Sequence, residues 1–125
     1  MSILVTGAAG FIGSHLCEAL LKDPKNKVVG IDNFNDYYDP AIKRTNIKDC
    51  LEQDRFTLIE GDICDQDCVD SIFQNHSIKV VYHLAARAGV RPSIEDPQLY
   101  ARVNVNGSLS ILECVRKYNV EKVIM

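Results

Sequence analysis

Three glycines, each three residues after the last, interrupt the first apolar run of this sequence and lead into a segment with helical periodicity. Residues 2–6 predict a short buried strand, and residues 11–22 predict a helix. The break between them contains Gly7, Gly10 and Gly13. The helix face that we expect to point inward carries Ile12, Leu16, Ala19 and Leu20. We expect the rest of the chain to be arranged around this strand, turn and helix.

Each glycine has its own role in such a turn. Gly7 can adopt the left-handed backbone conformation that ends the strand, and Gly10 leaves room for a pyrophosphate to approach the main chain. Gly13 lets the helix pack closely against the strand. The first helical turn has free N–H groups, and the helix dipole adds about 0.3–1 kcal/mol of attraction for an anion. A glycine triplet alone is nevertheless a weak signal of nucleotide binding.

A second predicted strand strengthens the signal. It covers residues 28–32 and ends in Asp32, roughly 20 residues after the glycines. This is the spacing of the carboxylate that hydrogen-bonds an adenosine ribose in dinucleotide-binding folds. The alternative is a glycine-rich turn and a loop-capping aspartate that hold no ligand. Asp32 also repels a 2′-phosphate, and no arginine follows in Asn33 or Phe34, so the pattern favours NAD over NADP.

Length and charge restrict the domain organisation and the partners. A chain of 125 residues is sufficient for one domain with one core. The 14 Lys and Arg residues are dispersed and the net charge is −3, so we expect no nucleic-acid partner and no membrane surface. No apolar run reaches the roughly 18 residues of a membrane helix, and no signal-peptide pattern precedes the first strand. We therefore expect a cytoplasmic protein with a small-molecule ligand.

The five cysteines are an odd number at irregular spacings, which favours reduced thiols over a disulfide framework. Cys64 and Cys68 could share a helix face. Two soft ligands without a third make a poor zinc site, so no metal is expected.

Strand and helix patterns alternate along the whole chain. Further strands are predicted at 56–60, 80–84 and from 120 onward, and further helices at 40–53, after Asp65, and from 97 to about 118. This alternation predicts a doubly wound parallel sheet of the Rossmann type, with strand order 3-2-1-4-5. The chain stops within the fifth strand. The inward face of the last helix is expected to carry Tyr100, Val103, Gly107, Ile111, Leu112 and Val115.

Ligands of such sheets bind beyond the carboxyl ends of the strands, where the strand order reverses. The predicted order places this point between the first and fourth strands. Four loops are expected to meet there: 7–13, 32–35, 62–63 and 84–91.

Several of these segments carry a family resemblance. Residues 6–13, the pair Gly61-Asp62, the segment 83–86 and the segment 104–107 together resemble the extended short-chain dehydrogenase/reductases, which include nucleotide-sugar epimerases and dehydratases. The resemblance covers all 125 residues. More narrowly, the segments 31–40 and 85–93 resemble those of UDP-glucuronate 4-epimerases.

The resemblance implies NAD as cofactor and gives individual residues a role in holding it. The implied pyrophosphate contacts are Gly7, Gly10, Phe11, Ile12 and Gly13. The implied contacts of the adenosine half are Asp32, Asn33, Asn35, Asp62 and Ile63. The implied contacts on the nicotinamide side are Leu84, Ala85, Ala86 and Arg87.

Substrate contacts are expected in the loop that follows the fourth strand. Arg87 and Arg91 are candidates for recognising a carboxylate or a phosphate, because guanidinium binds such groups through two hydrogen bonds. Gly89 and Val90 lie between them and are included as candidates. The alternative is that both arginines are simply solvated.

Three further polar residues have competing interpretations. Asn104 interrupts an apolar helix face and either supports the active-site region or makes a buried hydrogen bond to backbone. We interpret His83 as a packed core histidine and His15 as a helix-surface residue, because neither has a metal-binding or catalytic partner at a suitable spacing.

The resemblance also implies a catalytic Tyr-x-x-x-Lys pair on the helix after the fifth strand, with a Ser or Thr at the end of that strand. The sequence has one nominal match, Tyr118 and Lys122, which we reject because it bridges a helix end and a strand. We therefore expect no catalytic residue and no substrate domain in this chain, which would be inactive by itself.

Two functions remain open. One is the NAD-binding part of a UDP-sugar 4-epimerase, with a dehydratase as the alternative enzyme, and the other is a non-catalytic NAD-binding or assembly module. Because the fifth strand would form an unpaired edge, we expect homo-oligomers through that region.

Overall fold

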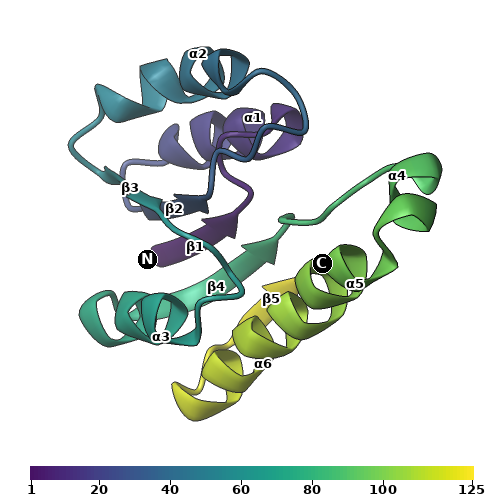
Figure 1. The fold of residues 1–125 in the computed structure, drawn as a ribbon. Coiled ribbons are helices and arrows are strands. Elements are labelled where there is room, and N and C mark those ends of the chain that lie inside the picture. The colour runs from purple at the N-terminus through teal and green to yellow at the C-terminus, as the bar shows by residue number, and fades with distance from the viewer.

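A parallel sheet of five strands in the order β3-β2-β1-β4-β5 forms the centre of the computed structural model, which describes residues 1–125 (Figure 1). All neighbouring strands pair in parallel. The strands are β1 (Ser2–Thr6), β2 (Lys27–Asp32), β3 (Phe56–Glu60), β4 (Ile78–His83) and β5 (Lys122–Ile124). The predicted strand order and Rossmann-type fold are confirmed.

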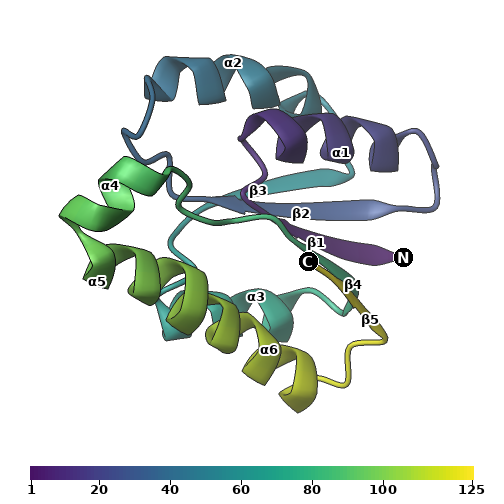
Figure 2. The ribbon, with the colours of Figure 1, turned by 90° about the vertical axis from the view of Figure 1, so that its right-hand side faces the viewer.

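Helices cover both faces of this sheet, as Figure 2 shows in side view. The α-helices are α1 (Phe11–Leu21), α2 (Pro40–Leu51), α3 (Gln66–Asn75), α4 (Val90–Glu95), α5 (Pro97–Tyr100) and α6 (Ser108–Lys117). A π-helix, η1 (Ala101–Gly107), joins α5 to α6. One face is covered by α1 and α2, and the other by α3 and the continuous segment from α5 to α6.

Each face has its own apolar core, so the expectation of a single core is wrong. The reason is that successive side chains of a strand point to opposite faces of the sheet. In β1, Ile3 and Val5 pack in the cluster that includes α1 and α2. Leu4 packs in the other cluster, with residues of α3 and α6. Both sheet faces are therefore apolar, as expected of a parallel sheet that is covered on both sides.

The buried face of α1 differs from the predicted one. Its buried residues are Gly13, Ser14, Cys17 and Leu21. Ile12 and Ala19 are exposed, while Leu16 and Leu20 pack along the flank of the core. The physical reason is the close approach at Gly13, where an added Cβ would lie 2.0 Å from the Gly7 carbonyl oxygen. Small side chains must form the contact face near this point.

The predicted long helix also differs in detail. It starts at Pro97, as expected, but seven of its residues form η1, and the preceding segment 90–95 forms α4 instead of a loop. Ile111 and Cys114 are buried, whereas Leu112, which was predicted to point inward, is 38% exposed. Val103, Gly107, Ile111 and Val115 do face the core as predicted, so the wider π-helical turn leaves most of the predicted face in place.

Candidate functional site

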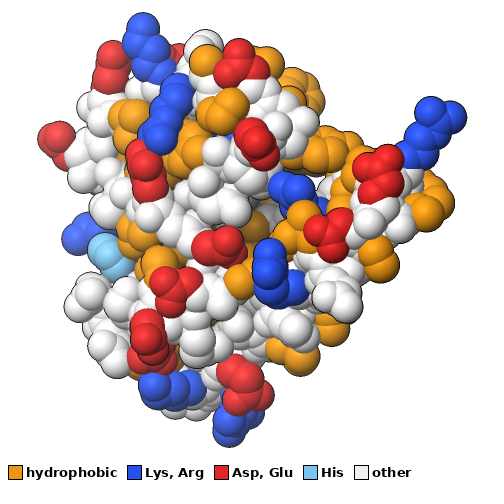
Figure 3. All heavy atoms as spheres, in the orientation of Figure 1, with side chains coloured by type: hydrophobic (Ala, Val, Ile, Leu, Met, Phe, Trp, Pro, Cys, Tyr) orange, Lys and Arg blue, Asp and Glu red, His pale blue; other side chains and the backbone are white.

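A cleft of about 750 Å³ lies beyond the carboxyl ends of β1, β2, β3 and β4. This is the position that the switch in strand order between β1 and β4 predicts, and the volume suits a small-molecule ligand. All the predicted cofactor-binding residues line it: Gly7, Gly10, Phe11, Ile12, Gly13, Asp32, Asn33, Asn35, Asp62, Ile63, Leu84, Ala85, Ala86 and Arg87. The surface is hollowed between the layer formed by α1 and α2 and the projection that carries α4 (Figure 3).

The turn between β1 and α1 presents unbonded N–H groups to this cleft. Gly7 has a φ of +69°, a left-handed conformation that suits glycine. The N–H groups of Phe11, Ile12 and Gly13 have no acceptor within the chain, and no side chain caps α1. Three free donors at the positive end of an 11-residue helix are suited to hold an anion.

Asp32, at the end of β2, bonds to the turn between β1 and α1. The residue is 6% exposed. One oxygen accepts a hydrogen bond from the Ala9 N–H at 3.0 Å, and the other accepts from the Phe34 N–H at 2.9 Å. The carboxylate thereby joins the turn after β1 to the loop after β2, and its remaining lone pairs can accept further hydrogen bonds from a ligand.

Lys43 is a cleft residue that the sequence analysis missed. It is 6% exposed, and its Nζ lies 3.4 Å from Asp32 Oδ1. It also lies 5.3 Å from the centre of the Tyr38 ring. The sequence signal was its place in the first turn of the helix predicted from residue 40, directly after the loop that follows Asp32.

The adenosine end predicted for the cleft is polar. The Cys64 N–H donates to Asp62 Oδ1 at 2.8 Å, and Asn33 Nδ2 donates to Asp62 Oδ2 at 3.4 Å. The Asn35 N–H donates to Asn33 Oδ1 at 3.1 Å. These bonds connect the loops after β2 and β3 into one wall.

Asn104 holds the opposite wall in place. The Arg87 N–H donates to Asn104 Oδ1 at 2.8 Å, and Asn104 Nδ2 donates to the Arg87 carbonyl oxygen at 3.0 Å. Both interpretations of Asn104 therefore hold. Its side chain bonds to the backbone of Arg87, and Arg87 lines the cleft. The Arg87 Nε is buried without a partner, and the guanidinium carbon lies 5.8 Å from the centre of the Tyr37 ring.

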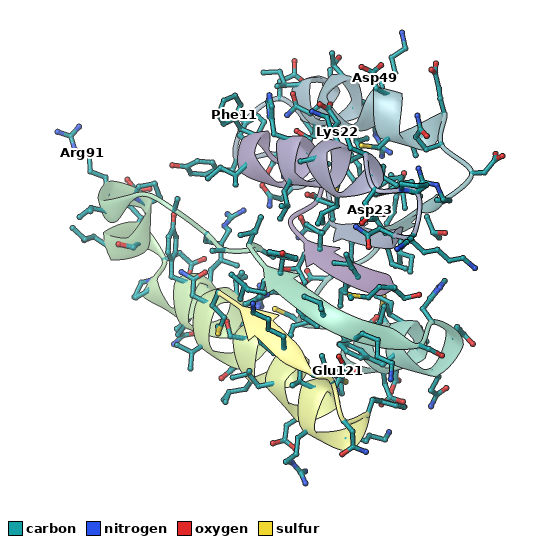
Figure 4. All side chains as sticks on the ribbon, turned by 180° about the vertical axis from the view of Figure 1, so that it is seen from behind. Phe11, Lys22, Asp23, Asp49, Arg91 and Glu121 are labelled. Atoms are coloured by element: carbon teal, nitrogen blue, oxygen red, sulfur yellow. The ribbon has the colours of Figure 1, made fainter.

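The tentative substrate residues lie outside the cleft. Gly89, Val90 and Arg91 are all exposed and none lines it. Arg91 points outward from the body of the protein (Figure 4). Of the two candidate arginines, the structure thus brings only Arg87 to the cleft.

Eleven lining residues were not among the predicted cofactor contacts, although Ala88 lies in the loop 84–91 that was expected at the cleft. They are Ile31, Tyr37, Tyr38, Ile42, Lys43, Asn46, Gly61, Ala88, Leu99, Arg102 and Val103. Most lie beside predicted segments. Leu99, Arg102 and Val103 instead come from the helix that begins at Pro97, where their spacing of three and four residues placed them on one helical face.

The two histidines behave as interpreted. His83 is 7% exposed, and its burial lowers the pKa of the imidazole. His15 is exposed on α1, with its Nδ1 2.7 Å from the Phe11 carbonyl oxygen.

The rejected Tyr-x-x-x-Lys match is structural. The Tyr118 hydroxyl donates to Asp70 at 3.1 Å and its ring stacks on Phe73, so it attaches the end of α6 to α3. Hydrogen bonds from Lys117 and Tyr118 lower the pKa of Asp70. Lys122 lies in β5, and neither Tyr118 nor Lys122 lines the cleft.

The thiols form no cluster of functional interest. All five cysteines are free, and burial raises the pKa of Cys17 to about 12. No group of three or more His, Cys, Asp or Glu side chains could hold a metal ion. None of the helices combines the length and the apolar character needed to span a membrane.

The buried Asp32–Lys43 pair predicts a large effect on stability. In Asp32→Asn, the Lys43 ammonium would be buried without a counter-ion, so we expect the free energy of unfolding to fall by about 3–5 kcal/mol. Adding Lys43→Met should restore most of that loss, as measured by urea denaturation. Glu60→Gln is the matched control, because Glu60 pairs with Arg44 at the surface and lies opposite Asp32 in the sheet. A double variant as unstable as Asp32→Asn would contradict this explanation.

Comparisons with known proteins agree with this geometry. A family model described as GDP-mannose 4,6 dehydratase matches residues 4–125. UDP-glucuronate 4-epimerase from Thermodesulfobacterium geofontis is 42% identical over 122 residues, which are 98% of this chain and 38% of that protein. UDP-glucuronate 4-epimerase 4 from Arabidopsis thaliana is 42% identical over 125 residues, which are 100% of this chain and 28% of that protein.

Solved structures show the same likeness. UDP-glucuronic acid 4-epimerase from Bacillus cereus, in complex with UDP-glucuronic acid and NAD, superposes with a TM-score of 0.90 at 44% identity, over 98% of this chain and 38% of that chain. UDP-glucose 4-epimerase from Thermus thermophilus, in complex with NAD, gives a TM-score of 0.83 at 37% identity, over 98% of this chain and 36% of that chain. The chain thus spans less than two fifths of the length of these relatives. It belongs to the family described as GDP-mannose 4,6 dehydratase, among the NAD-dependent nucleotide-sugar epimerases and dehydratases.

Proposed function

We propose that these 125 residues form the NAD-binding part of a nucleotide-sugar 4-epimerase that interconverts UDP-glucuronate and UDP-galacturonate. The observation that carries the proposal is the meeting of two groups in one cleft: the free N–H groups of residues 11–13 and the carboxylate of Asp32. A dinucleotide needs both, since its pyrophosphate is an anion and its ribose offers hydroxyl groups.

The lining residues fit the parts of NAD. The N–H groups of residues 11–13 hold the pyrophosphate, and Asp32 accepts hydrogen bonds from the adenosine ribose. Asp62 and Ile63 contact the adenine, and the loop 84–87 lies along the nicotinamide side. When bound, NAD supplies the acceptor for the hydride of the sugar C4–H bond, and the resulting 4-keto sugar receives it back on its other face.

The same side chains favour NAD over NADP. The Asp32 carboxylate would repel a 2′-phosphate, although Lys43 offsets part of its charge. Arg44, one residue later, would have to exchange its present partner to bind that phosphate. It pairs with Glu60, and its guanidinium carbon lies 3.7 Å from the centre of the Phe34 ring.

Catalysis requires more than these residues. We propose that the catalytic tyrosine, lysine and hydroxyl groups and the substrate domain lie outside these 125 residues, and that the chain alone binds NAD without turning over a sugar. The similarity to UDP-glucuronate 4-epimerases favours an epimerase. The description of the matching family model favours a dehydratase as the second candidate.

The proposal extends to location and assembly. The five free thiols and the small-molecule ligand suit the cytoplasm. β5 pairs with β4 alone, so its other edge presents unpaired backbone groups. We propose that two chains associate through this edge.

Light scattering tests the association. We expect an average mass above that of one chain at working concentration, and a fall towards the monomer mass in Ile124→Lys, because an edge lysine disfavours strand pairing and Ile124 belongs to neither core cluster. A sharp monomer mass for the unsubstituted chain would contradict the proposal.

Thermal unfolding tests the NAD site. NAD at 100 times its dissociation constant adds about 2.7 kcal/mol of stability, which raises the unfolding midpoint by about 10 °C in a domain of this size. NADP should give a much smaller shift. In Gly10→Ala the new Cβ meets only the Gly7 carbonyl oxygen, at 3.3 Å, and otherwise enters the space in front of α1.

We therefore expect Gly10→Ala to fold and to lose the NAD shift. Lys22→Ala, at the opposite end of α1, is the control and should keep it. Equal shifts with NAD and NADP, or no shift in a folded sample, would refute the NAD assignment.

A turnover assay separates the candidate activities. With NAD and UDP-glucuronate, we expect no UDP-galacturonate from the chain alone, measured by proton NMR of the sugar. The same chain extended by the catalytic and substrate regions should form UDP-galacturonate. Formation of a 4-keto-6-deoxy sugar from a UDP-hexose by the extended chain would indicate a dehydratase instead.

A further inference from the structure

His83 lies between two hydroxyl groups from different parts of the chain. Its Nδ1 is 2.7 Å from Thr6 Oγ1, at the end of β1, and its Nε2 is 2.9 Å from Ser108 Oγ, at the start of α6. The ring is 7% exposed and bonds to no charged side chain. The proposed function assigns no role to this buried titratable group.

The hydrogen bonds of Thr6 determine which group donates and which accepts in these contacts. Thr6 Oγ1 accepts from the N–H groups of Leu84 and Ala85, both at 3.0 Å. These two bonds occupy both acceptor sites of the hydroxyl, which must therefore donate its one proton to His83 Nδ1. The imidazole proton is then on Nε2 and is donated to Ser108 Oγ.

The series of hydrogen bonds continues from Ser108 to the cleft. The Ser108 hydroxyl donates to the Asn104 carbonyl oxygen at 2.7 Å. The Asn104 side chain in turn holds both backbone groups of Arg87. One series of hydrogen bonds thus fixes the loop 84–87 at both ends, through Thr6 at its start and through Asn104 at its end.

We propose that His83, neutral and protonated on Nε2, is a positioning residue for the cofactor cleft, and that its protonation releases the loop 84–87 and weakens NAD binding. This inference rests on the proposed NAD site for its effect on affinity, but not for the hydrogen-bond chain itself.

Protonation of His83 would disrupt its hydrogen bond with Thr6. A proton on Nδ1 would face a hydroxyl oxygen that already accepts two hydrogen bonds and whose own proton would lose its acceptor. The two side chains bonded to the ring, Thr6 from β1 and Ser108 from α6, do not titrate, and no charged group contributes to the shift of its pKa. Burial alone lowers the pKa of His83 below its ordinary value of 6.5. NAD binding should therefore be intact at neutral pH and weaken only below pH 6.5.

Nitrogen-15 NMR of the free chain tests the hydrogen-bond chain without NAD and without a variant. We expect His83 to show the neutral Nε2–H tautomer and to titrate below its ordinary value of 6.5. The Arg87 amide signal should shift with the same midpoint. An Nδ1–H tautomer, or an Arg87 amide that does not follow His83, would overturn the inference whether or not the chain binds NAD.

The pH profile of the NAD dissociation constant tests the consequence. Between about pH 7.5 and 5 we expect affinity to fall at least threefold, and NAD itself changes no charge in this range. His83→Asn keeps an acceptor for Thr6 but cannot be protonated, so its profile should be flat. His15→Gln is the matched control, because it removes the histidine on α1 and should keep the acid step.

Each outcome is decisive. An acid step that persists in His83→Asn, or disappears in His15→Gln, would refute the role of His83. A chain that binds no NAD at pH 7.5 would refute the proposed function, and the NMR result would then decide the positioning role alone. If His83→Asn does not fold, the tautomer and the coupled Arg87 titration in the unsubstituted chain give the answer.

Discussion

The close approach of α1 to the end of β1 is the constraint on which the rest of this structure depends. Any side chain at Gly13 would collide with the Gly7 carbonyl oxygen, so the helix can begin directly above the strand only with glycine there. That position aims the free N–H groups of the first helical turn at the cleft. Asn46, from α2, donates to the Ala9 carbonyl oxygen and fastens the same turn from the side.

The cleft needs this turn to be rigid, and buried polar contacts provide the rigidity. Asp32 bonds to the turn and to the loop after β2, while Lys43 offsets its charge within the protein. On the other side, Thr6 and Asn104 fix the loop after β4. Buried polar groups are costly unless they are fully bonded, so these contacts allow few alternative arrangements of the walls.

Local sequence patterns predicted the fold, and they predicted residues that meet in one cleft. The glycine spacing, the acidic end of β2 and the alternation of elements are local signals, and parallel strands bring their carboxyl ends together without further information. An aspartate before a helix is a local signal as well, and the side chains of Asp39 and Asp65 cap α2 and α3 by accepting backbone hydrogen bonds.

What the sequence did not predict depends on contacts between distant segments. The prediction of the inward face of α1 was wrong because periodicity does not reveal how closely a helix approaches the sheet. Lys43 escaped notice because a lysine on a predicted helix is normally solvated, and only its partner Asp32 explains its burial. Phe34 has a φ of +50°, which no propensity favours for a bulky residue, and the Asp32 carboxylate that binds its N–H accounts for the bend.

The π-helix η1 makes one helix sensitive to the length of the chain. Its turns contain one residue more than those of an α-helix, since each hydrogen bond spans five residues instead of four. Deleting one residue between 101 and 107 would convert the segment to an α-helix without breaking it, because six residues of α-helix turn about as far as seven of π-helix. α5 and α6 would keep their faces, but Asn104 would shift relative to both. A change of length in this segment therefore affects the placement of Asn104, and with it the wall of the cleft, even where the helix itself stays intact.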